Sequence, residues 1–144
     1  MTVKIIKGNL LDSNAGIILH QVNLQGVMGS GVAFQIARRF PDAEREYLNF
    51  ENKSLGEVNF AKIGPKNWVG NCFSQRVNFD TDYKALRECL RKVKRFMRQN
   101  NISEVAIPYN FGCGIANGDW EEVSKIFLHT FDEKGITLSI YRRN

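Results

Sequence analysis

The chain has 144 residues, of which 43% are hydrophobic, so we expect a single domain over residues 1–144 with a core of its own. Twenty Lys and Arg against fifteen Asp and Glu give a formal net charge of +5, which favours a small anionic ligand over a nucleic acid that wraps the protein. The cysteines Cys72, Cys89 and Cys113 form no CxxC pair, and no apolar run reaches the roughly 20 residues of a membrane span. We therefore expect a reducing, cytoplasmic setting without a disulfide framework, metal, cofactor or membrane segment.

Strands and helices alternate along the chain in the pattern of its apolar residues. In chain order, we predict strands at residues 3–6 and 16–23, helices at 32–40 and 42–52, strands at 57–63 and 68–75, a helix at 82–100, a strand at 104–108, a helix at 120–133 and a strand at 137–141. Pro41 ends the first helix, and Asp42, a residue type that favours the N-cap, begins the second. The turn residues GPKN predict a hairpin between residues 57 and 75. This alternation favours a sheet between two helical layers.

The predicted helix at 82–100 is strongly amphipathic. Its apolar residues Leu86, Leu90, Val93 and Met97 follow one another at spacings of four, three and four residues, which places them on one side of the helix. The other side is basic and carries Lys84, Arg87, Arg91, Lys94, Arg95 and Arg98. Such a face is usually only solvated, but it could also contact RNA.

Two stretches share one layout, in which a strand leads through a glycine-rich loop into a helix. They read HQVNLQGVMGSGVAFQI, from His20, and AIPYNFGCGIANGDWEEV, from Ala106. Backbone N–H groups in such loops can hold phosphate oxygens, and glycine permits the unusual backbone angles and the close approach. Two such cradles suit a diphosphate, although each loop can also be a plain tight turn. Neither stretch has the GxxxxGK(S/T) pattern or the GxGxxG spacing of a dinucleotide fold, so hydrolysis of nucleoside triphosphates is disfavoured.

Together, the segments IIKGNLLD, ILHQVNLQGVMGSGVAFQIARRFPDAE and PYNFGCGIANGDWEEV resemble the macrodomain family over nearly the whole chain. The pattern HxxNxxGxMGxGxAxQ, followed by an aromatic residue, Pro, any residue and Ala, is similar to one part of that family. That part holds fungal ADP-ribose-1''-phosphate phosphatases, bacteriophage macrodomain proteins and the terminal ADP-ribose protein glycohydrolases. The resemblance implies a three-layer α/β/α domain with a central mixed sheet, which binds ADP-ribose in a cleft at the strand ends.

The resemblance also implies which residues contact the ligand. It places Asn9 and Leu10 near the adenine, Asn23 and residues 29–32 at the distal ribose, and residues 112–116 along the diphosphate. Individually, the residues of the two loops are Gly29, Ser30, Gly31 and Val32, and Gly112, Cys113, Gly114, Ile115 and Ala116. Tyr141 could pack on the adenine and Phe111 could line the ribose side, although aromatic residues at such positions are more often part of a core.

The chain departs from the family pattern at two places. Many macrodomains have Asp where this chain has Asn9, whose amide oxygen can still accept a hydrogen bond from the adenine amino group but carries no charge. The glycohydrolases use a lysine and an aspartate in covalent chemistry. Here Ala116 stands at the place of the aspartate, and the lysine's segment resembles the one that holds Gln75 and Arg76. We therefore do not expect that covalent mechanism.

His20 and Asp119 are the candidates for catalysis. An imidazole or a carboxylate can orient or deprotonate a water for attack at phosphorus or at the anomeric carbon, and a histidine is found at the place of His20 in the phosphatase-like branch. A lone histidine on a buried strand can equally be a core residue, and an Asp just before Trp120 can be a helix N-cap. Cys113 is a weaker candidate, as a nucleophile activated by the N–H groups of its loop.

Three functions remain open from the sequence. The first is a hydrolase of ADP-ribose derivatives, which either removes the phosphate of ADP-ribose-1''-phosphate or cleaves ADP-ribose from a macromolecule. The alternative is a reader that binds free or attached ADP-ribose without turnover, which Ala116 favours because it replaces an acid. The third and weakest is an RNA-associated domain that uses the basic face of residues 84–98. In each case we expect a monomer.

Overall fold

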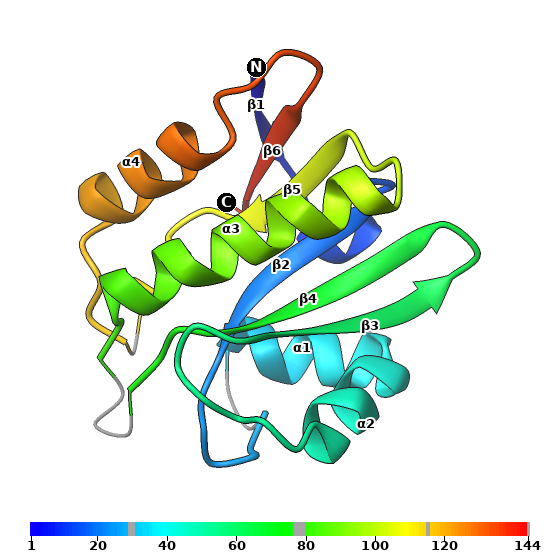
Figure 1. Cartoon of the computed structure of the whole chain (residues 1–144), viewed down its shortest axis with the longest axis vertical. Helices are drawn as coiled ribbons and strands as arrows, with labels where there is room; N and C mark the ends of the chain where they lie inside the picture. Colours follow the sequence, from blue (N-terminus) through cyan, green and yellow to red (C-terminus); the bar gives the residue numbers. More distant parts are fainter. Residues whose placement is uncertain (29–30, 77–79, 115, 144) are drawn as a thin grey trace.

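The computed structural model describes residues 1–28, 31–76, 80–114 and 116–143. Within them, six strands form one sheet, in the order β1 (Thr2–Lys7), β6 (Thr137–Arg142), β5 (Glu104–Pro108), β2 (Ile17–Val22), β4 (Asn67–Phe73) and β3 (Val58–Gly64) (Figure 1). All neighbouring strands are parallel except β4 and β3, which are antiparallel. The sheet is therefore mixed, and the predicted hairpin is confirmed.

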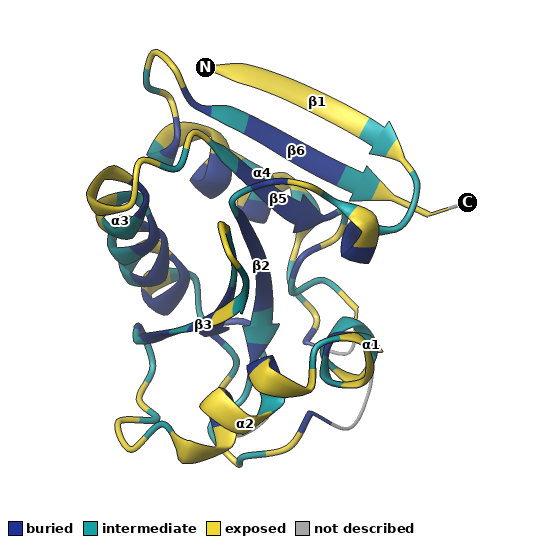
Figure 2. Ribbon diagram, turned by 90° about the vertical axis from the view of Figure 1, so that its right-hand side faces the viewer, coloured by how far each residue is buried: buried dark blue, intermediate teal, exposed yellow. Residues whose placement is uncertain are grey.

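Helices cover both faces of the sheet (Figure 2). On one face, α3 (Tyr83–Gln99) and α4 (Trp120–Thr130) bury apolar side chains against Ile17, Leu19 and their neighbours in the sheet. On the other face lie the short 3-10 helix η1 (Leu10–Asp12), α1 (Gly31–Arg39) and α2 (Pro41–Asn49). The predicted three-layer α/β/α arrangement is confirmed.

The boundary between α1 and α2 differs from the prediction. Asp42 is not the N-cap, because Pro41 takes the first helical position and Phe40 precedes it without a side-chain cap. Proline favours this position because its missing N–H would have no partner in the helix. Helix α2 also ends at Asn49 and α4 at Thr130, in each case three residues before the predicted end.

Helix α3 follows its sequence pattern closely. The Asp82 side chain accepts a hydrogen bond from the Ala85 N–H at 2.8 Å and so caps the first turn. The predicted apolar stripe is buried along its length, from Leu86 to Met97. No helix in the described part of the chain is both long and apolar enough to cross a bilayer.

Side chains along β2 alternate between the two helical layers. Leu19 packs with α3 and α4, while Ile18 and Val22 pack in clusters on the opposite face. His20 therefore faces the layer of α1 and α2, and Gln21 faces the other layer. Because β2 and β5 are parallel, their carboxyl ends lie at the same edge of the sheet, and the two glycine-rich loops that follow them meet there.

Candidate functional site

Two adjoining cavities lie where the glycine-rich loops meet. The larger has a volume of about 680 Å³ and the smaller about 390 Å³, within the range of small-molecule sites. Both are lined by Val32, Pro108, Tyr109 and Asn110. The two cavities therefore form one groove that crosses the ends of β2 and β5.

Most of the predicted site residues line this groove. The larger cavity is lined by His20, Asn23, Gly31, Val32, Phe111, Gly112, Gly114 and Ala116. The smaller is lined by Asn9, Leu10, Val32 and Tyr141. Gly29, Ser30 and Ile115 lie outside the described residues. Cys113 and Asp119 are not part of either wall as far as the structure describes them.

The loop after β5 presents free backbone donors. Its own turns use the N–H groups of Cys113 and Gly118, which donate to Asn110 O at 2.8 Å and Gly112 O at 2.9 Å. The N–H groups of Gly112, Gly114 and Ala116 donate to no acceptor within the described ranges. All three residues line the larger cavity, so their donors are available to an anion.

The start of α1 lies across the same cavity. Gly31, Val32 and Ala33 line its wall, and they belong to the first turn, whose N–H groups have no partner inside the helix. Gly31 has a φ of +61°, a left-handed angle that glycine adopts at little cost. The groove therefore has a partly positive helix end on one side and free loop donors on the other.

Tyr47 of α2 fixes the loop after β2. Its side chain is fully buried, and its hydroxyl accepts the Val27 N–H at 3.0 Å and lies 2.7 Å from Asn23 Oδ1. Asn23 Oδ1 also accepts the Gln25 N–H at 3.0 Å, and Asn23 Nδ2 donates to Val27 O at 2.9 Å. The Asn23 side chain thus uses Oδ1 and one N–H of Nδ2 to hold the loop in shape. The second N–H of Nδ2 can donate to a ligand.

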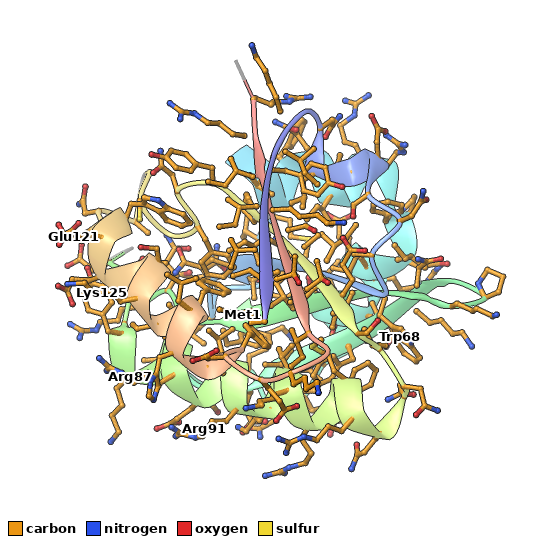
Figure 3. The ribbon with its side chains drawn as sticks, turned by 90° about the horizontal axis from the view of Figure 1, so that it is seen from above. Met1, Trp68, Arg87, Arg91, Glu121 and Lys125 are labelled. Atoms are coloured by element: carbon orange, nitrogen blue, oxygen red, sulfur yellow. The ribbon has the colours of Figure 1, made fainter. Side chains whose placement is uncertain are left out.

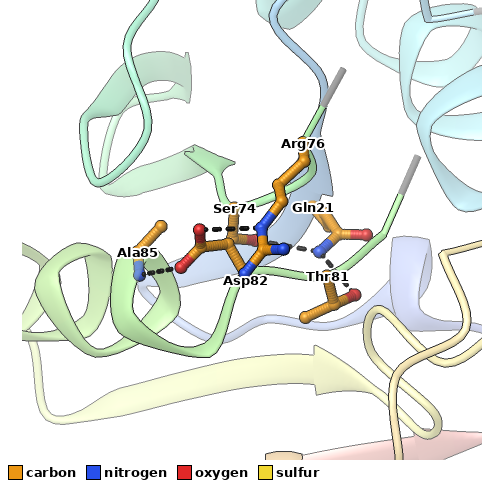
Figure 4. Close-up of polar contacts among 6 residues, drawn as sticks. All are labelled: Gln21, Ser74, Arg76, Thr81, Asp82 and Ala85. Atoms are coloured by element: carbon orange, nitrogen blue, oxygen red, sulfur yellow. Dashed lines mark hydrogen bonds and ion pairs between the residues drawn. The ribbon is translucent and has the colours of Figure 1, made fainter. Parts of the chain in front are cut away.

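A chain of hydrogen bonds from β2 supports the loop after β5 (Figure 4). Gln21 Nε2 donates to Ser74 Oγ at 3.0 Å and to Thr81 Oγ1 at 3.1 Å. Thr81 Oγ1 donates to Gly112 O at 2.6 Å, and the Thr81 N–H donates to Ala116 O at 2.9 Å. A side chain on Gly112 would collide with this chain, because its Cβ would lie 2.8 Å from Thr81 Oγ1.

The described residues on either side of 77–79, between β4 and α3, contact the same region. Gln75 and Thr81 form an isolated antiparallel bridge, and Gln75 lines the larger cavity. Arg76 Nε donates to Asp82 Oδ2 at 3.0 Å, beside the Asp82 bond that caps α3 (Figure 4). Partial burial raises the pKa of Asp82, but the Ala85 N–H and the Arg76 guanidinium outweigh it and lower that pKa. Asp82 is therefore a stable anion that joins this segment to α3.

His20 is buried beneath the larger cavity, with 1% of its surface exposed. Its Nε2 lies 2.5 Å from Asn71 Oδ1. Asn71 Nδ2 donates to Ala43 O at 3.2 Å and to Asn59 Oδ1 at 2.9 Å, so Asn71 Oδ1 is an acceptor and His20 Nε2 carries the proton. Nδ1 is then an unprotonated acceptor, and it has no partner in the described part of the protein.

Burial lowers the pKa of His20 to about 4, against the opposing effect of its hydrogen bond to Asn71. At neutral pH the ring is therefore neutral and a weak base. Its free Nδ1 can accept a hydrogen bond from a water or a ligand hydroxyl. Of the two predicted roles, orientation of a water fits this environment, and deprotonation of a water does not.

Asp119 and Cys113 have structural roles. Asp119 Oδ1 accepts the Glu121 N–H at 3.0 Å and caps α4, as the alternative interpretation of the sequence expects. Cys113 Sγ donates to Phe111 O at 3.2 Å. Burial, with the Asp119 carboxylate nearby, raises the pKa of the Cys113 thiol to about 11, so the thiol is protonated at neutral pH. This is the opposite of the activation that a nucleophile needs.

The smaller cavity has a polar and aromatic wall. Asn9 Oδ1 accepts the Leu11 N–H at 3.0 Å and caps η1, which leaves Asn9 Nδ2 free to donate within the described surroundings. The Arg142 guanidinium lies 4.7 Å from the centre of the Tyr109 ring, in cation–π contact. Tyr109 is thereby held in place between the two cavities. No group of three or more His, Cys, Asp or Glu side chains in the described ranges could hold a metal ion.

Sequence reasoning missed several residues of this site, and four of them show why. Tyr109 and Asn110 lie within a quoted motif, and Gln21 directly follows His20, so proximity to the motifs was the only signal for them. Tyr47 lies in an ordinary helical pattern, and nothing in the sequence relates it to Asn23.

Comparison with known proteins gives a consistent result. Residues 19–127 match the Macro domain family. The ADP-ribose glycohydrolase OARD1 of Bos taurus is 27% identical over 137 residues, which cover 94% of this chain and 88% of that protein. The DNA ADP-ribosyl glycohydrolase of Mycobacterium tuberculosis is 28% identical and covers 88% of this chain, which spans only 38% of that protein. The solved macrodomain of Mycobacterium tuberculosis DarG has a TM-score of 0.86 at 24% identity, with 97% of each chain covered.

The low pKa of His20 predicts a specific pH dependence of stability. The unfolded chain binds the His20 proton with the ordinary pKa of 6.5 and the folded chain with a pKa of about 4. The contribution of neutral His20 to stability is therefore fully present above pH 6.5 and is lost as the pH falls toward 4. Between pH 7 and 5, the free energy of unfolding measured in urea should fall by ~2 kcal/mol more in the parent than in His20→Gln. His129→Gln, an exposed site on α4, is the control. Equal pH dependence in the parent and His20→Gln would contradict the assignment.

The Thr81 hydroxyl should be needed to support the loop after β5. Thr81→Val keeps the shape but removes an acceptor for Gln21 and the donor to Gly112 O. We expect the free energy of unfolding to fall by ~0.5–1.5 kcal/mol, since the half-buried Gly112 O loses one of its two donors and keeps the Gly118 N–H. Thr81→Ser keeps the hydroxyl and should lose less. Urea unfolding curves that coincide for the two variants would rule out this role.

Proposed function

Since the chain belongs to the Macro domain family, we propose that its groove binds ADP-ribose and that the protein hydrolyses a derivative of this ligand. The observation that carries the proposal is that the N–H groups of Gly112, Gly114 and Ala116 have no acceptor among the described residues, in a cavity that the first turn of α1 also lines. Donors converging from two sides suit the linked phosphates of a diphosphate better than a single anion.

The two cavities match the two ends of such a ligand. The smaller one offers Asn9 and the rings of Tyr109 and Tyr141 to the adenine. The larger one offers Asn23 and His20 to the distal ribose. The diphosphate would then cross the shared wall at Val32 and Asn110, next to the free donors of both loops.

Hydrolysis is supported by His20 and by the names of the relatives. His20 lines the cavity that would hold the distal ribose, and its Nδ1 is buried without a partner among the described residues, so a water that reaches it could be positioned for attack. Two relatives, at 27% and 28% identity, are named as glycohydrolases that act on ADP-ribose or on ADP-ribosylated DNA. We therefore place release of ADP-ribose from a modified macromolecule ahead of phosphate removal from ADP-ribose-1''-phosphate.

A reader function is the second candidate. Ala116 is buried in the wall where the sequence resemblance expects an acid, and Asp119 is engaged as a helix cap outside the described walls. A site without these acids can bind ADP-ribose and leave it intact. We also propose a cytoplasmic location, because all three cysteines are free thiols.

Substrate comparison distinguishes these possibilities. The protein is incubated separately with ADP-ribose-1''-phosphate, ADP-ribosylated protein and ADP-ribosylated DNA, and release of phosphate or ADP-ribose is measured. Release of ADP-ribose supports the glycohydrolase, and release of phosphate supports the phosphatase. Tight binding of ADP-ribose without release from any of the three substrates would establish the reader.

Gly31→Glu should abolish ADP-ribose binding, because it places bulk and negative charge in the wall of the larger cavity. Gly31→Ala is the matched control. A Cβ at this position meets no atom within 4 Å, so both variants carry only the cost of a left-handed φ, roughly 1 kcal/mol, and should fold. Calorimetry should detect ADP-ribose binding by the alanine variant but not by the glutamate variant. Equal affinity in the two would place the ligand elsewhere.

His20→Gln should lower turnover of the substrate identified above by roughly 100-fold, because misplacing the attacking water costs about that much. The Kd of ADP-ribose should change little, since the lost interaction is with the water. For the parent, kcat/KM should be flat between roughly pH 6 and 8, because the ring stays neutral there. A step in rate near pH 6.5 would show that His20 titrates in this range and would contradict the assigned environment.

A further inference from the structure

Four cations form one row along the outer face of α3, which we call the basic row: Lys84, Arg87, Arg91 and Arg95. All four are exposed, and their spacings of three, four and four residues are those of neighbours on one side of a helix. Figure 3 shows the side chains of Arg87 and Arg91 directed away from the body of the protein. At ~1.5 Å per residue, the row is ~16 Å long.

The basic row is not neutralised by its surroundings. None of its four members has an ionic partner in the described part of the chain. The acid that belongs to α3 itself, Glu88, lies against Gly56 instead. Nearby acids are already paired with other cations: Glu57 with Lys92, Glu133 with Lys94 and Arg98, and Glu121 and Glu122 with Lys125.

The row begins beside the groove. Tyr83, the residue before Lys84, accepts the Asp119 N–H at 2.9 Å through its hydroxyl, which ties the start of α3 to the end of the glycine-rich loop. Asp82 donates its N–H to Ser74 O at 2.8 Å, next to Gln75 in the wall of the larger cavity. A polymer attached to a ligand in that cavity would therefore leave it near the first cation of the row.

We infer that the macromolecule carrying the ADP-ribosyl group is a nucleic acid whose phosphates lie along the basic row. This inference rests on the proposed function. A nucleic acid supplies a regular line of negative charges, which matches a straight row of cations better than the irregular charges of a folded acidic protein. Three of the four cations are arginines, whose planar guanidinium can bind a phosphate through two hydrogen bonds.

The test is the salt dependence of DNA binding. Affinity for a fluorescent single-stranded DNA of about 20 nucleotides is measured between roughly 50 and 200 mM NaCl, and the logarithm of the association constant is plotted against the logarithm of the salt concentration. Four phosphate contacts predict a slope of about −3 for the parent, and Arg87→Gln with Arg91→Gln should reduce it to about −1.5. The control is Lys4→Gln with Lys66→Gln, which removes the same charge from β1 and the β3–β4 turn and should leave the slope unchanged.

A second comparison links the basic row to the groove. The same DNA with one ADP-ribosyl group on its terminal phosphate should bind the parent at least roughly tenfold more tightly than the unmodified DNA, because both surfaces are then occupied by one ligand. Removing Arg87 and Arg91 should weaken binding of this DNA and leave the Kd of free ADP-ribose unchanged.

Equal salt slopes in the parent and the Arg87→Gln, Arg91→Gln variant would overturn the inference, as would equally tight binding of a polyglutamate of the same charge. Both results leave the proposed function intact if free ADP-ribose binds. Failure of free ADP-ribose to bind the parent would instead overturn the proposed function, whatever the slopes are.

Discussion

The groove depends on several backbone N–H groups at the ends of two parallel strands that have no acceptor among the described residues. Such groups are costly in a folded protein unless water or a ligand satisfies them. The loop after β5 holds this arrangement because side chains satisfy its other polar groups: Thr81 Oγ1 binds Gly112 O, and Gln21 holds Thr81. Gly118 allows the loop to close on itself, since a Cβ there would lie 2.4 Å from Gly112 O. Among the described residues, the carbonyl groups of Gly112 and Ala116 thus have donors, while the N–H groups of Gly112, Gly114 and Ala116 have no acceptor.

His20 and Gln21 are adjacent on β2 but serve opposite faces of the sheet. Gln21 supports the loop on the side of α3, and His20 enters a polar cluster with Asn71 and Asn59 beneath α2. That cluster fixes the proton on Nε2 and leaves Nδ1 as a buried, neutral acceptor without a partner in the described part of the protein, on a residue that lines the cavity. A neutral acceptor beside an anionic ligand avoids a salt bridge that would bind substrate and product alike. Under the proposed function, catalysis at this site depends more on how His20 positions the water than on proton transfer by His20.

The sequence predicted the elements well because their signals are local. Apolar spacing located α3 to within a residue at each end, and the glycine loops marked the groove. The start of α2 was misplaced because Pro41 and Asp42 both favour a helix N-terminus. Pro41, whose ring fixes its φ, occupies the first helical position, so Asp42 lies inside the helix. The support by Tyr47 of a loop 20 or more residues away depends on how α2 packs, which no local pattern encodes. The protonation state of His20 was equally hidden, since its low pKa follows from its burial and the position of its proton from Asn71 on a neighbouring strand.

The central claim is that one continuous groove, shared by both cavities, holds ADP-ribose with its diphosphate between the two glycine-rich loops. Amide resonances followed by two-dimensional NMR during titration with ADP-ribose test it most directly. We expect the largest shifts at Gly112, Gly114 and Ala116 and in the first turn of α1, with further shifts at Asn9 and Arg142 in the smaller cavity. Shifts confined to one cavity, or centred on the exposed strand β1 on the outer edge of the sheet, would contradict it.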